Sequence, residues 1–302
     1  MRRPSYLNGL DAGTLAKKAN TARAALAQCR LCPRRCGANR LSGETGICRT
    51  GRRAVVASAH PHFGEEPELV GVNGSGTIFF THCSLGCRFC QNADISHEGY
   101  GSAVDDAALA GMMLELQAMG CHNINFVTPS HVVPQILAAV LIAAENGLRI
   151  PLVYNSSGYD SVSTLALLEG VIDIYMPDFK FWDAQIAEAT CSAPDYPETA
   201  RRAILEMQRQ VGTLRTDARG IALQGLIIRH LVLPGDLSGT AAIAQFIASQ
   251  LDTDSYVNVM PQYRPCGETS AVEALNRRLK PSEFAAAVAA ARQAGLTRLS
   301  GF

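Results

Sequence analysis

Three cysteines with the spacing of metal ligands follow a short apolar segment of the chain. Cys83, Cys87 and Cys90 are separated by three and two residues, and they come directly after residues 77–80, which are typical of a buried strand. Three thiolates on such a loop can hold three irons of a four-iron cluster, which normally has four cysteine ligands. One iron would then be open to a substrate or cofactor, and an open position distinguishes a reactive metal site from a structural one.

The same cysteines permit two other interpretations. They could bind zinc together with a fourth ligand such as His82 or His97, which stand nearby in the sequence. They could also be buried thiols without any ligand, because free cysteine behaves as a small apolar residue. Cys121, Cys191 and Cys266 stand alone in the sequence, and we expect them to be buried in this way.

The motif resembles the signature of the radical S-adenosylmethionine (radical SAM) superfamily, which is Cys-x3-Cys-x2-Cys with an aromatic residue, here Phe89, before the last cysteine. Gln91 and Asn92 are similar to the branch that contains activating enzymes for glycyl-radical enzymes such as pyruvate formate-lyase. The resemblance implies that the open iron of a [4Fe-4S] cluster binds S-adenosyl-L-methionine (SAM) beside Phe89 and Asn92. The reduced cluster would cleave SAM to a 5′-deoxyadenosyl radical, which abstracts a hydrogen atom.

A second group of cysteines lies nearer the N-terminus. Cys29, Cys32, Cys36 and Cys48 are separated by two, three and eleven residues, with glycine and proline between them, as in loop-rich metal sites. Zn²⁺ and a second iron–sulfur cluster both accept four thiolates, so the sequence leaves the metal open. Glycyl-radical activating enzymes place extra clusters after the radical SAM motif. The present arrangement departs from theirs and weakens a transfer of their substrate.

Composition favours a cytoplasmic enzyme. The chain has 302 residues, of which 47% are hydrophobic and 18% charged, as in ordinary globular proteins. No apolar run approaches the roughly 18–20 residues that cross a bilayer, so we expect no membrane partner. Polar residues follow the basic N-terminus where a signal peptide needs an apolar core. Clustered cysteines in a cytosolic enzyme indicate metal ligands rather than disulfides.

Charge is unevenly distributed although the net charge is zero. Residues 1–53 contain twelve Lys or Arg and two acidic residues, a balance of +10, so the rest of the chain carries −10. The basic segment can offset the negative charge of a tetrathiolate metal site or bind the acidic remainder of the chain. Nucleic acid is an unlikely partner, because no aromatic residues alternate with these charges to stack on bases.

Strand and helix patterns alternate along most of the chain. A leading helix is expected over 11–28 and a strand over 54–60, and the α/β class follows from six strand–helix units after them. Their strands are predicted at 76–82, 122–127, 151–155, 171–176, 221–232 and 255–260. Their helices are predicted at 104–119, 131–146, 161–169, 182–190 with 197–212, 238–251 and 281–294. The resemblance implies a partial, TIM-like (β/α)6 barrel over 54–302, preceded by a helix and Cys-rich basic segment over 1–53.

Reactive groups of such barrels gather at the carboxyl ends of the strands. The second strand ends near Thr128 and Ser130, where the activating enzymes carry Gly-Gly-Glu, so these hydroxyls would have to replace a carboxylate toward the amino group of SAM. Ser130 could equally cap the next helix. The third strand ends at Asn155 and Ser156, which are similar to the family's polar turn at the ribose and carboxylate.

The fourth and fifth strand ends carry charged residues. Asp178 and Lys180 resemble the Asp-x-Lys of the activating enzymes, and pairing with each other or with SAM would explain both charges; a surface ion pair is the alternative. Arg229 and His230 are adjacent, so they point to opposite faces of the strand. The resemblance places His230 near the ribose. A buried histidine satisfied by a hydrogen bond is the alternative.

The sixth strand is followed by Tyr263 and Cys266, which we expect near the substrate, where either could donate or relay a hydrogen atom. The leading function is hydrogen abstraction from an unidentified substrate, with a glycyl-radical protein or another polypeptide as the expected class. A reductant such as flavodoxin or ferredoxin would be its partner. The alternatives are SAM-dependent methyl or other group transfer at the cluster, and a non-catalytic module that binds metal and nucleic acid.

Overall fold

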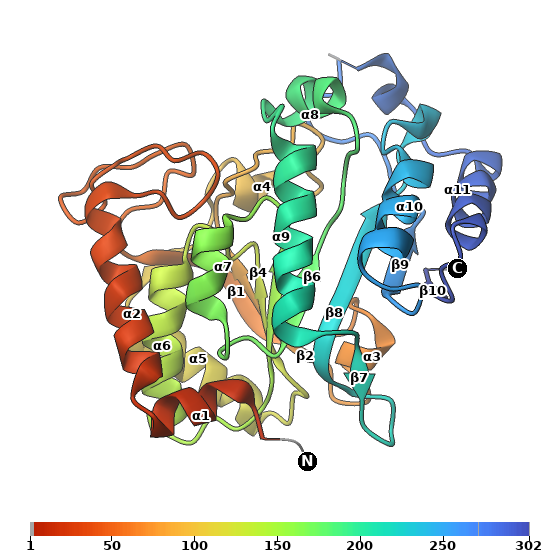
Figure 1. The fold of residues 1–302 in the computed structure, drawn as a ribbon. Coiled ribbons are helices and arrows are strands. Elements are labelled where there is room, and N and C mark those ends of the chain that lie inside the picture. The colour runs from red at the N-terminus through yellow and green to blue at the C-terminus, as the bar shows by residue number, and fades with distance from the viewer. Residues whose placement is uncertain (1–2, 271, 302) are drawn as a thin grey trace.

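A ten-stranded sheet forms the centre of the computed structural model, which describes residues 3–270 and 272–301 (Figure 1). In chain order its strands are β1 (Ala54–His62), β2 (Ser75–Phe80), β3 (Ser102–Val104), β4 (Ile124–Val127), β5 (Leu152–Ser156), β6 (Ile174–Pro177), β7 (Arg215–Thr216), β8 (Ala222–Leu231), β9 (Tyr256–Met260) and β10 (Arg298–Ser300). In space they follow the order β10-β9-β8-β6-β5-β4-β2-β1-β3, and β7 pairs with β8.

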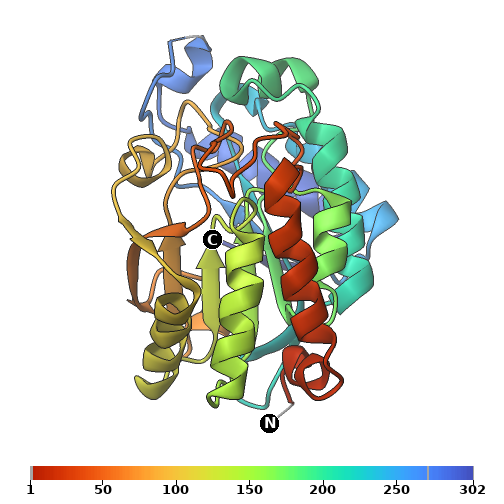
Figure 2. The same ribbon diagram turned by 90° about the vertical axis from the view of Figure 1, so that its left-hand side faces the viewer.

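Helices and helical turns connect these strands. They are α1 (Ser5–Asp11), α2 (Thr14–Ala24), η1 (Ala25–Gln28), α3 (Pro67–Val70), α4 (Ala93–Ser96), α5 (Asp106–Ala118), α6 (Val133–Glu145), α7 (Val162–Leu168), α8 (Ala184–Cys191), α9 (Tyr196–Val211), η2 (Pro234–Asp236), α10 (Thr240–Gln250), η3 (Glu273–Asn276) and α11 (Pro281–Gln293). The long helices run along the outside of the curved sheet (Figures 1 and 2).

The six predicted strand–helix units are present. Strands β2, β4, β5, β6, β8 and β9 pair in parallel in this order, as right-handed crossovers through helices require. The sheet does not close, because β3 and β10 lie at its two edges in the described part of the chain. The α/β class is therefore confirmed, as an open sheet.

Several elements differ from the sequence-based expectation. The leading helix over 11–28 is instead α1 followed by α2, because Gly13 has a left-handed φ of 67° that interrupts helical geometry. Strand β1 pairs antiparallel with β2 and β3, so the parallel region begins only at β2. The three-residue strand β10 lies parallel to β9 and is too short for an alternating pattern to predict it.

Helix α9 illustrates how the outer layer is built. It begins with Pro197 in its first turn, where a missing N–H is tolerated, and its chain leaves the helix at Gly212 with φ 72°. Ala203, Ile204 and Met207 recur at helical spacing and are fully buried. This stripe packs α9 against the sheet beside β6 and β8, whose ends carry charged site residues.

The two larger clusters of the apolar core lie on opposite sides of the sheet, and a small third cluster of Leu26, Cys29 and Leu31 lies in the N-terminal segment. The largest cluster lies between the helices and the outer face of the strands, where Tyr154 and Ile228 are buried. The second cluster lies on the inner face around Leu69 of α3, which closes the amino-terminal end of the strands. Its members are Leu69, Val153, Ile174, Met176, Leu214, Ala222, Ile227 and Tyr256. Successive strand residues therefore alternate between the two cores.

The N-terminal segment packs against this body. The Tyr6 hydroxyl donates to the carbonyl of Ile150 at 3.1 Å, and the backbone N–H of Ser5 donates to Asp173 at 2.8 Å. Tyr6 and Leu15 belong to the same core as the outer faces of the strands. The division into segments 1–53 and 54–302 stays a prediction.

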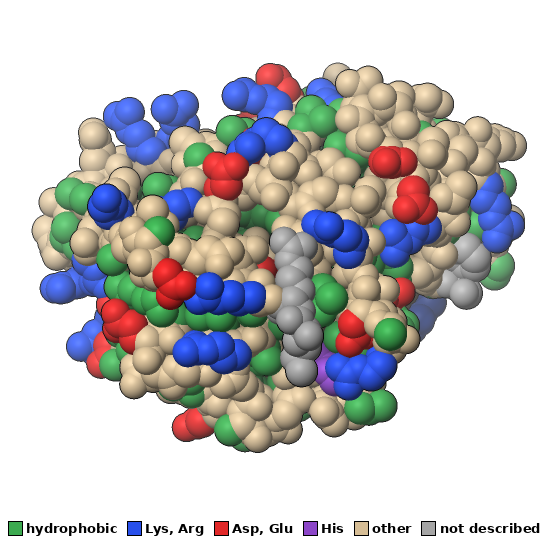
Figure 3. Space-filling model, turned by 60° about the horizontal axis from the view of Figure 1, so that its bottom comes forward, with side chains coloured by type: hydrophobic (Ala, Val, Ile, Leu, Met, Phe, Trp, Pro, Cys, Tyr) green, Lys and Arg blue, Asp and Glu red, His purple; other side chains and the backbone are tan. Residues whose placement is uncertain are grey.

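Two surface properties bear on partners. Basic and acidic side chains are interspersed on the end of the molecule shown in Figure 3, rather than separated by sign. Among the described residues, the structure contains no helix with the length and apolar character that crossing a membrane requires.

Replacing Leu69 with Ala should destabilise the inner core strongly. The side chain is fully buried, so its loss leaves a cavity, and we expect the free energy of unfolding to fall by about 2–5 kcal/mol. Val72, three residues later, is 84% exposed, and Val72→Ala should change stability by less than about 0.5 kcal/mol. Urea unfolding followed by circular dichroism measures both. Equal unfolding midpoints for the two variants would contradict this account of the inner core.

Candidate functional site

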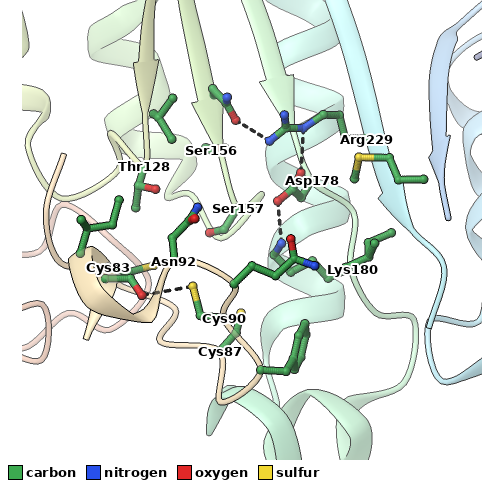
Figure 4. A pocket seen from close by; sticks show the side chains of 18 of the residues that line it. Cys83, Cys87, Cys90, Asn92, Thr128, Ser156, Ser157, Asp178, Lys180 and Arg229 are labelled. Carbon is green, nitrogen blue, oxygen red and sulfur yellow. Dashed lines mark hydrogen bonds and ion pairs between the residues drawn. The ribbon is translucent and has the colours of Figure 1, made fainter. Parts of the chain in front are cut away.

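A cavity of about 250 Å³ opens at the carboxyl ends of the central strands (Figure 4). Reactive groups of β/α barrels lie at this end of the strands. Its lining comes from the cysteine loop after β2 and from the ends of β4, β5, β6, β8 and β9. The lining residues are Phe80, Cys83, Cys87, Phe89, Cys90, Gln91, Asn92, Ile95, Ser96, Val127, Thr128, Asn155, Ser156, Ser157, Asp178, Lys180, Arg229, Leu231, Met260 and Gln262.

The cysteine loop brings its three thiols to one side of this cavity. Cys83, Cys87 and Cys90 all line it, and hydrogen-bond donors approach two of their sulfurs. The backbone N–H of Leu85 lies 3.4 Å from Sγ of Cys83, and Oγ of Ser96 lies 3.1 Å from Sγ of Cys90. Donors aimed at sulfur are suited to thiolates rather than thiols.

The thiol chemistry of the loop fits a metal cluster. Burial, with a smaller contribution from the nearby Cys87 thiolate, raises the pKa of Cys83 to about 12. A thiolate at neutral pH therefore needs a positive partner, and a coordinating metal deprotonates a thiol outright. Among residues 3–270 and 272–301, no three His, Cys, Asp or Glu side chains converge on a single ion position. A four-iron cluster needs no such convergence, because each thiolate binds a different iron.

A buried network of charges forms the opposite wall. The Asp178 carboxylate follows β6 and lies 2.6 Å from Nζ of Lys180 and 3.0 Å from Nε of Arg229 (Figure 4). Burial would raise the pKa of Asp178, but attraction to Lys180 and Arg229 outweighs it and lowers the pKa. Burial likewise opposes the charge of Lys180, and attraction to Asp178 and Cys87 raises its pKa instead. All three groups are therefore charged at neutral pH.

Arg229, rather than His230, faces the cavity. Its guanidinium donates to Oδ1 of Asn155 at 2.8 Å and lies 3.3 Å from a carboxylate oxygen of Glu65. The cause is strand alternation, because Ile227 belongs to the inner core and Arg229 shares its face.

His230 does not line the cavity, and its expected place near the ribose stays a prediction. It is buried on the outer face, where its ring nitrogens lie 2.8 Å from the Phe179 carbonyl and 2.9 Å from the Thr240 hydroxyl. Burial lowers its pKa, so the ring is neutral at physiological pH. The alternative of a buried histidine satisfied by hydrogen bonds describes this position.

Hydroxyl and amide groups at the ends of β4 and β5 form a polar side of the cavity. Thr128, Asn155, Ser156 and Ser157 line the cavity here. Figure 4 shows three of them, Thr128, Ser156 and Ser157. Thr128 has a left-handed φ of 59°, an uncommon conformation for a β-branched residue that is often found at functional sites.

Ser130 lies behind this side rather than on it. The buried Asp160 carboxylate accepts hydrogen bonds from Ser156 at 2.6 Å and Tyr154 at 2.9 Å. Burial raises the pKa of Asp160, and hydrogen bonds from Ser156 and Ser130 partly offset that effect. Ser130 therefore supports the polar side through Asp160, while its predicted role toward SAM stays untested.

Tyr263 and Cys266 lie behind the cysteine loop and do not line the cavity. The Tyr263 hydroxyl donates to the carbonyl of Leu275 at 2.8 Å. The ring of Tyr263 packs edge-on against that of Phe89, with 6.1 Å between the two ring centroids. The Cys266 thiol donates to the carbonyl of Phe89 at 3.1 Å. In this structure both residues hold Phe89 in place; their predicted part in hydrogen transfer stays a prediction.

Cys191 is a site neighbour that sequence reasoning missed. Its thiol hydrogen-bonds with that of Cys87, and this contact contributes to raising the pKa of Cys87. The two residues are far apart in the sequence, so no spacing pattern connects them. The position of Arg229, in contrast, follows from the alternation of β8.

The four N-terminal cysteines lie close to one another. The pKa of Cys32 is raised to about 12, mainly by burial. The Arg34 backbone N–H partly opposes this increase, and the charges of Cys48, Cys29 and Cys36 add to it. Cys36 is exposed and the other three are buried.

No protein-family model matches the chain. It is 32% identical over 275 residues to the uncharacterized protein MJ0674 of Methanocaldococcus jannaschii, an alignment that spans 89% of this chain and 75% of that protein. The chain belongs to the same family as MJ0674. Since this relative is uncharacterized, the membership brings no activity with it.

A structural likeness identifies the fold. A radical SAM methyltransferase from Sphaerobacter thermophilus matches with a TM-score of 0.50 and 12% identity. The match covers 75% of this chain and 66% of the methyltransferase, just under two thirds of its length. The chain therefore has a fold like that of this methyltransferase. This likeness does not distinguish the glycyl-radical activating enzymes from other enzymes with such a fold.

Replacing Asp178 with Asn should leave the buried cations Lys180 and Arg229 without their shared carboxylate partner. Removing one partner of a buried ion pair costs about 3–5 kcal/mol of unfolding free energy, whereas Asp254→Asn should cost about 0–1 kcal/mol. Asp254 is the matched control, because it pairs with Arg298 at 3.5 Å and is 58% exposed. Urea unfolding of both variants at neutral pH provides the comparison.

The deficit of the Asp178→Asn variant should also depend on pH. The native pKa of Asp178 is lowered from its ordinary value of 3.8, so its charge stabilises the fold above that value and stops doing so as pH falls through the native pKa. The difference from the unmodified protein should thus be full at neutral pH and shrink in acid. A pH-independent difference would contradict the ionised state assigned to Asp178.

Proposed function

We propose that this protein is a radical SAM enzyme whose [4Fe-4S] cluster is held by Cys83, Cys87 and Cys90. The observation that carries the proposal is a single cavity with three cysteines on one side and a buried, charged wall on the other. Such a cluster, when bound and reduced, supplies the electron for reductive cleavage of SAM and hydrogen abstraction from a substrate. The likeness in fold to a radical SAM methyltransferase supports this reading.

Lys180 is the cation offered to the cofactor. Its side chain is 16% exposed, and the contact with Asp178 keeps Nζ protonated and fixes its position. Asp178 can hold Lys180 firmly because Arg229 neutralises much of the remaining negative charge. We propose that Nζ of Lys180 binds the carboxylate of SAM and thereby orients it toward the cysteine loop.

The polar side at the ends of β4 and β5 is proposed to bind the ribose and the amino group. Arg229 holds the amide of Asn155, and Asp160 holds the hydroxyl of Ser156, so both groups present fixed polar atoms. Thr128 lies where the activating enzymes have Gly-Gly-Glu, and its hydroxyl can accept a hydrogen bond from an ammonium group. This replacement removes one negative charge from the site.

The substrate and partners form the finer part of the proposal. We propose a polypeptide substrate of the glycyl-radical class, a flavodoxin or ferredoxin as reductant, and a cytoplasmic location. The support is the resemblance of Gln91-Asn92 and of the Asp178–Lys180 pair to the glycyl-radical activating enzymes. Methyl transfer would instead release S-adenosylhomocysteine, which the experiment below also detects.

Loss of a cluster ligand should abolish SAM cleavage. Anaerobic protein reconstituted with iron and sulfide, then reduced and mixed with SAM, should yield 5′-deoxyadenosine. Cys87→Ala should yield none, because one iron loses its thiolate. Cys121→Ala, at a buried cysteine outside the cavity lining, should retain the activity. If the reconstituted, reduced protein binds SAM but releases only S-adenosylhomocysteine, the result would contradict reductive cleavage and indicate group transfer instead.

Loss of the Lys180 charge should weaken SAM binding. Hydrogen bonds to charged groups contribute about 1.5–3 kcal/mol, so Lys180→Met should raise the Kd for SAM by roughly 10- to 100-fold. Lys18→Met is the matched control, since Lys18 lies on α2 and contacts only backbone carbonyls of Ala166 and Glu169 among the described residues. Equilibrium dialysis of reconstituted protein measures both constants. An unchanged Kd in Lys180→Met would remove Lys180 from the cofactor site.

A further inference from the structure

The loop over residues 29–53 folds back on itself around its cysteines. The backbone N–H of Cys29 donates to the carbonyl of Ala38 at 3.0 Å, and the N–H of Gly37 donates to the carbonyl of Cys29 at 2.9 Å. These bonds bring Cys36 back beside Cys29, with Sγ of Cys36 4.0 Å from the Cys29 carbonyl oxygen. The first and third cysteines are thus held together by the backbone.

The return of the loop closes on the same thiols. A Cβ added to Gly46 would lie 2.2 Å from Sγ and 3.0 Å from Cβ of Cys36, so only glycine lets the chain approach this closely. Cys48 follows two residues later, in a turn closed by the N–H of Arg49 on the Gly46 carbonyl at 2.9 Å. Four thiols in one loop are the ligand set of a structural zinc or of a four-iron cluster.

A buried guanidinium lies against this loop. Arg40 is 1% exposed, and it donates to the carbonyls of Gly51 at 3.0 Å and His131 at 2.8 Å. Its Nη1 also lies 3.8 Å from Sγ of Cys29, while its Nη2 is buried without a hydrogen-bond partner among the described residues. Arg40 takes part in none of the ion pairs found among the described residues.

Such a cation calls for a negative neighbour. Burying an unpaired charge is costly, and the groups that contact Arg40 are neutral carbonyls and a thiol. Four thiolates carry more negative charge than a divalent zinc or the iron–sulfide core offsets, so the bound centre has a net negative charge. A metal at the four cysteines would therefore place a buried anion beside the Arg40 guanidinium.

Arg34, between Cys32 and Cys36, links the loop to the first cysteine trio. Its guanidinium donates to the carbonyls of Ser84 at 3.0 Å and Leu85 at 2.9 Å, which lie between Cys83 and Cys87. The same guanidinium also donates to two backbone carbonyls at the end of α8, that of Cys191 at 2.7 Å and that of Ser192. The four-cysteine loop thus contacts the backbone of the cluster loop directly.

A second cavity, of about 200 Å³, lies between the two cysteine groups. Cys48 lines it from one group and Cys83 from the other, together with His82 and His97. The two groups are therefore neighbours in space, although 34 residues separate Cys48 from Cys83 in the sequence.

We propose that Cys29, Cys32, Cys36 and Cys48 bind a second metal centre through their thiolates. A four-iron cluster fits thiols that, among the described residues, do not converge on one ion position, whereas Zn²⁺ would require the four thiols to move closer together on binding. Binding releases the thiol protons and gives Arg40 its missing negative neighbour. The closed loop then fixes Arg34 on the carbonyls of the cluster loop and so positions Cys83 and Cys87. This site does not depend on the proposed SAM chemistry.

Metal content tests the site without the first cluster. In full-length protein with Cys83, Cys87 and Cys90 all changed to Ser, we expect about one zinc, or about four irons with four sulfides, per chain by elemental and sulfide analysis. Adding Cys36→Ser to this variant should remove that metal, and adding Cys121→Ser should not. The ratio of zinc to iron and sulfide identifies the centre. A folded triple variant that holds neither metal after reconstitution would overturn the proposal.

Alkylation of the unmodified protein provides a measurement that does not depend on how the variants fold. Cys36 is exposed, so a free thiol there should react rapidly with iodoacetamide. A bound metal should protect it until a zinc chelator, or oxidative destruction of iron–sulfur clusters, removes the metal; peptide mass spectrometry follows the reaction. Rapid alkylation of Cys36 before either treatment would contradict the site.

Hydrogen exchange tests the positioning role of Arg34. In the variant that lacks the first three cysteines, removal of the second metal should accelerate exchange in residues 83–90. Arg34→Gln should produce the same acceleration while the metal content stays unchanged. If neither treatment changes exchange in this segment, the loop does not position the cluster ligands.

Discussion

One buried carboxylate organises the charged half of the cavity. Asp178 accepts from both Lys180 and Arg229, and each of those cations would be costly to bury without it. Arg229 in turn holds Asn155 at the end of β5, so the side-chain positions on three strands depend on one anion. The strand order places β5, β6 and β8 side by side, which is what allows a single carboxylate to serve all three.

The cysteine half of the cavity depends on contacts from much farther along the chain. Phe89, within the cysteine motif, meets Tyr263 edge-on, and Cys266 donates to its carbonyl. Arg34 approaches the same loop from the N-terminal segment. The loop that carries Cys83, Cys87 and Cys90 is thus restrained by residues from both the N-terminal and the C-terminal parts of the chain. This arrangement explains why the N-terminal segment lies at the cavity rather than apart from it.

Much of the fold follows from patterns that are local in sequence. Alternating apolar strands and amphipathic helices predict the six parallel units, because each pattern reflects burial against a neighbouring layer. The positions of Cys83, Thr128, Asn155 and Lys180 at the cavity follow from the same reasoning, since strand ends meet at one edge. The interruption at Gly13 depends on a single backbone conformation, which the Ala-rich helical pattern did not reveal.

The remaining features depend on partners that sequence spacing does not encode. Tyr263 and Cys266 follow the last predicted strand and still point away from the cavity, because their hydroxyl and thiol find backbone carbonyls behind it. Cys191 meets Cys87 only because α8 ends beside the cysteine loop. The sequence could have predicted that Arg229, rather than His230, lines the cavity. The alternation of residues along β8 decides this once Ile227 is assigned to the inner core.

The central claim is that the three thiols of Cys83, Cys87 and Cys90 leave one iron open to SAM. Electron paramagnetic resonance tests it most directly, on reduced protein in which Cys29, Cys32, Cys36 and Cys48 are changed to Ser, so that only this site can hold a cluster. The account predicts the signal of a reduced four-iron cluster that changes when SAM is added, because the cofactor binds the open iron. A cluster signal that SAM leaves unaltered, or reconstituted protein that contains zinc and no iron at this site, would contradict it.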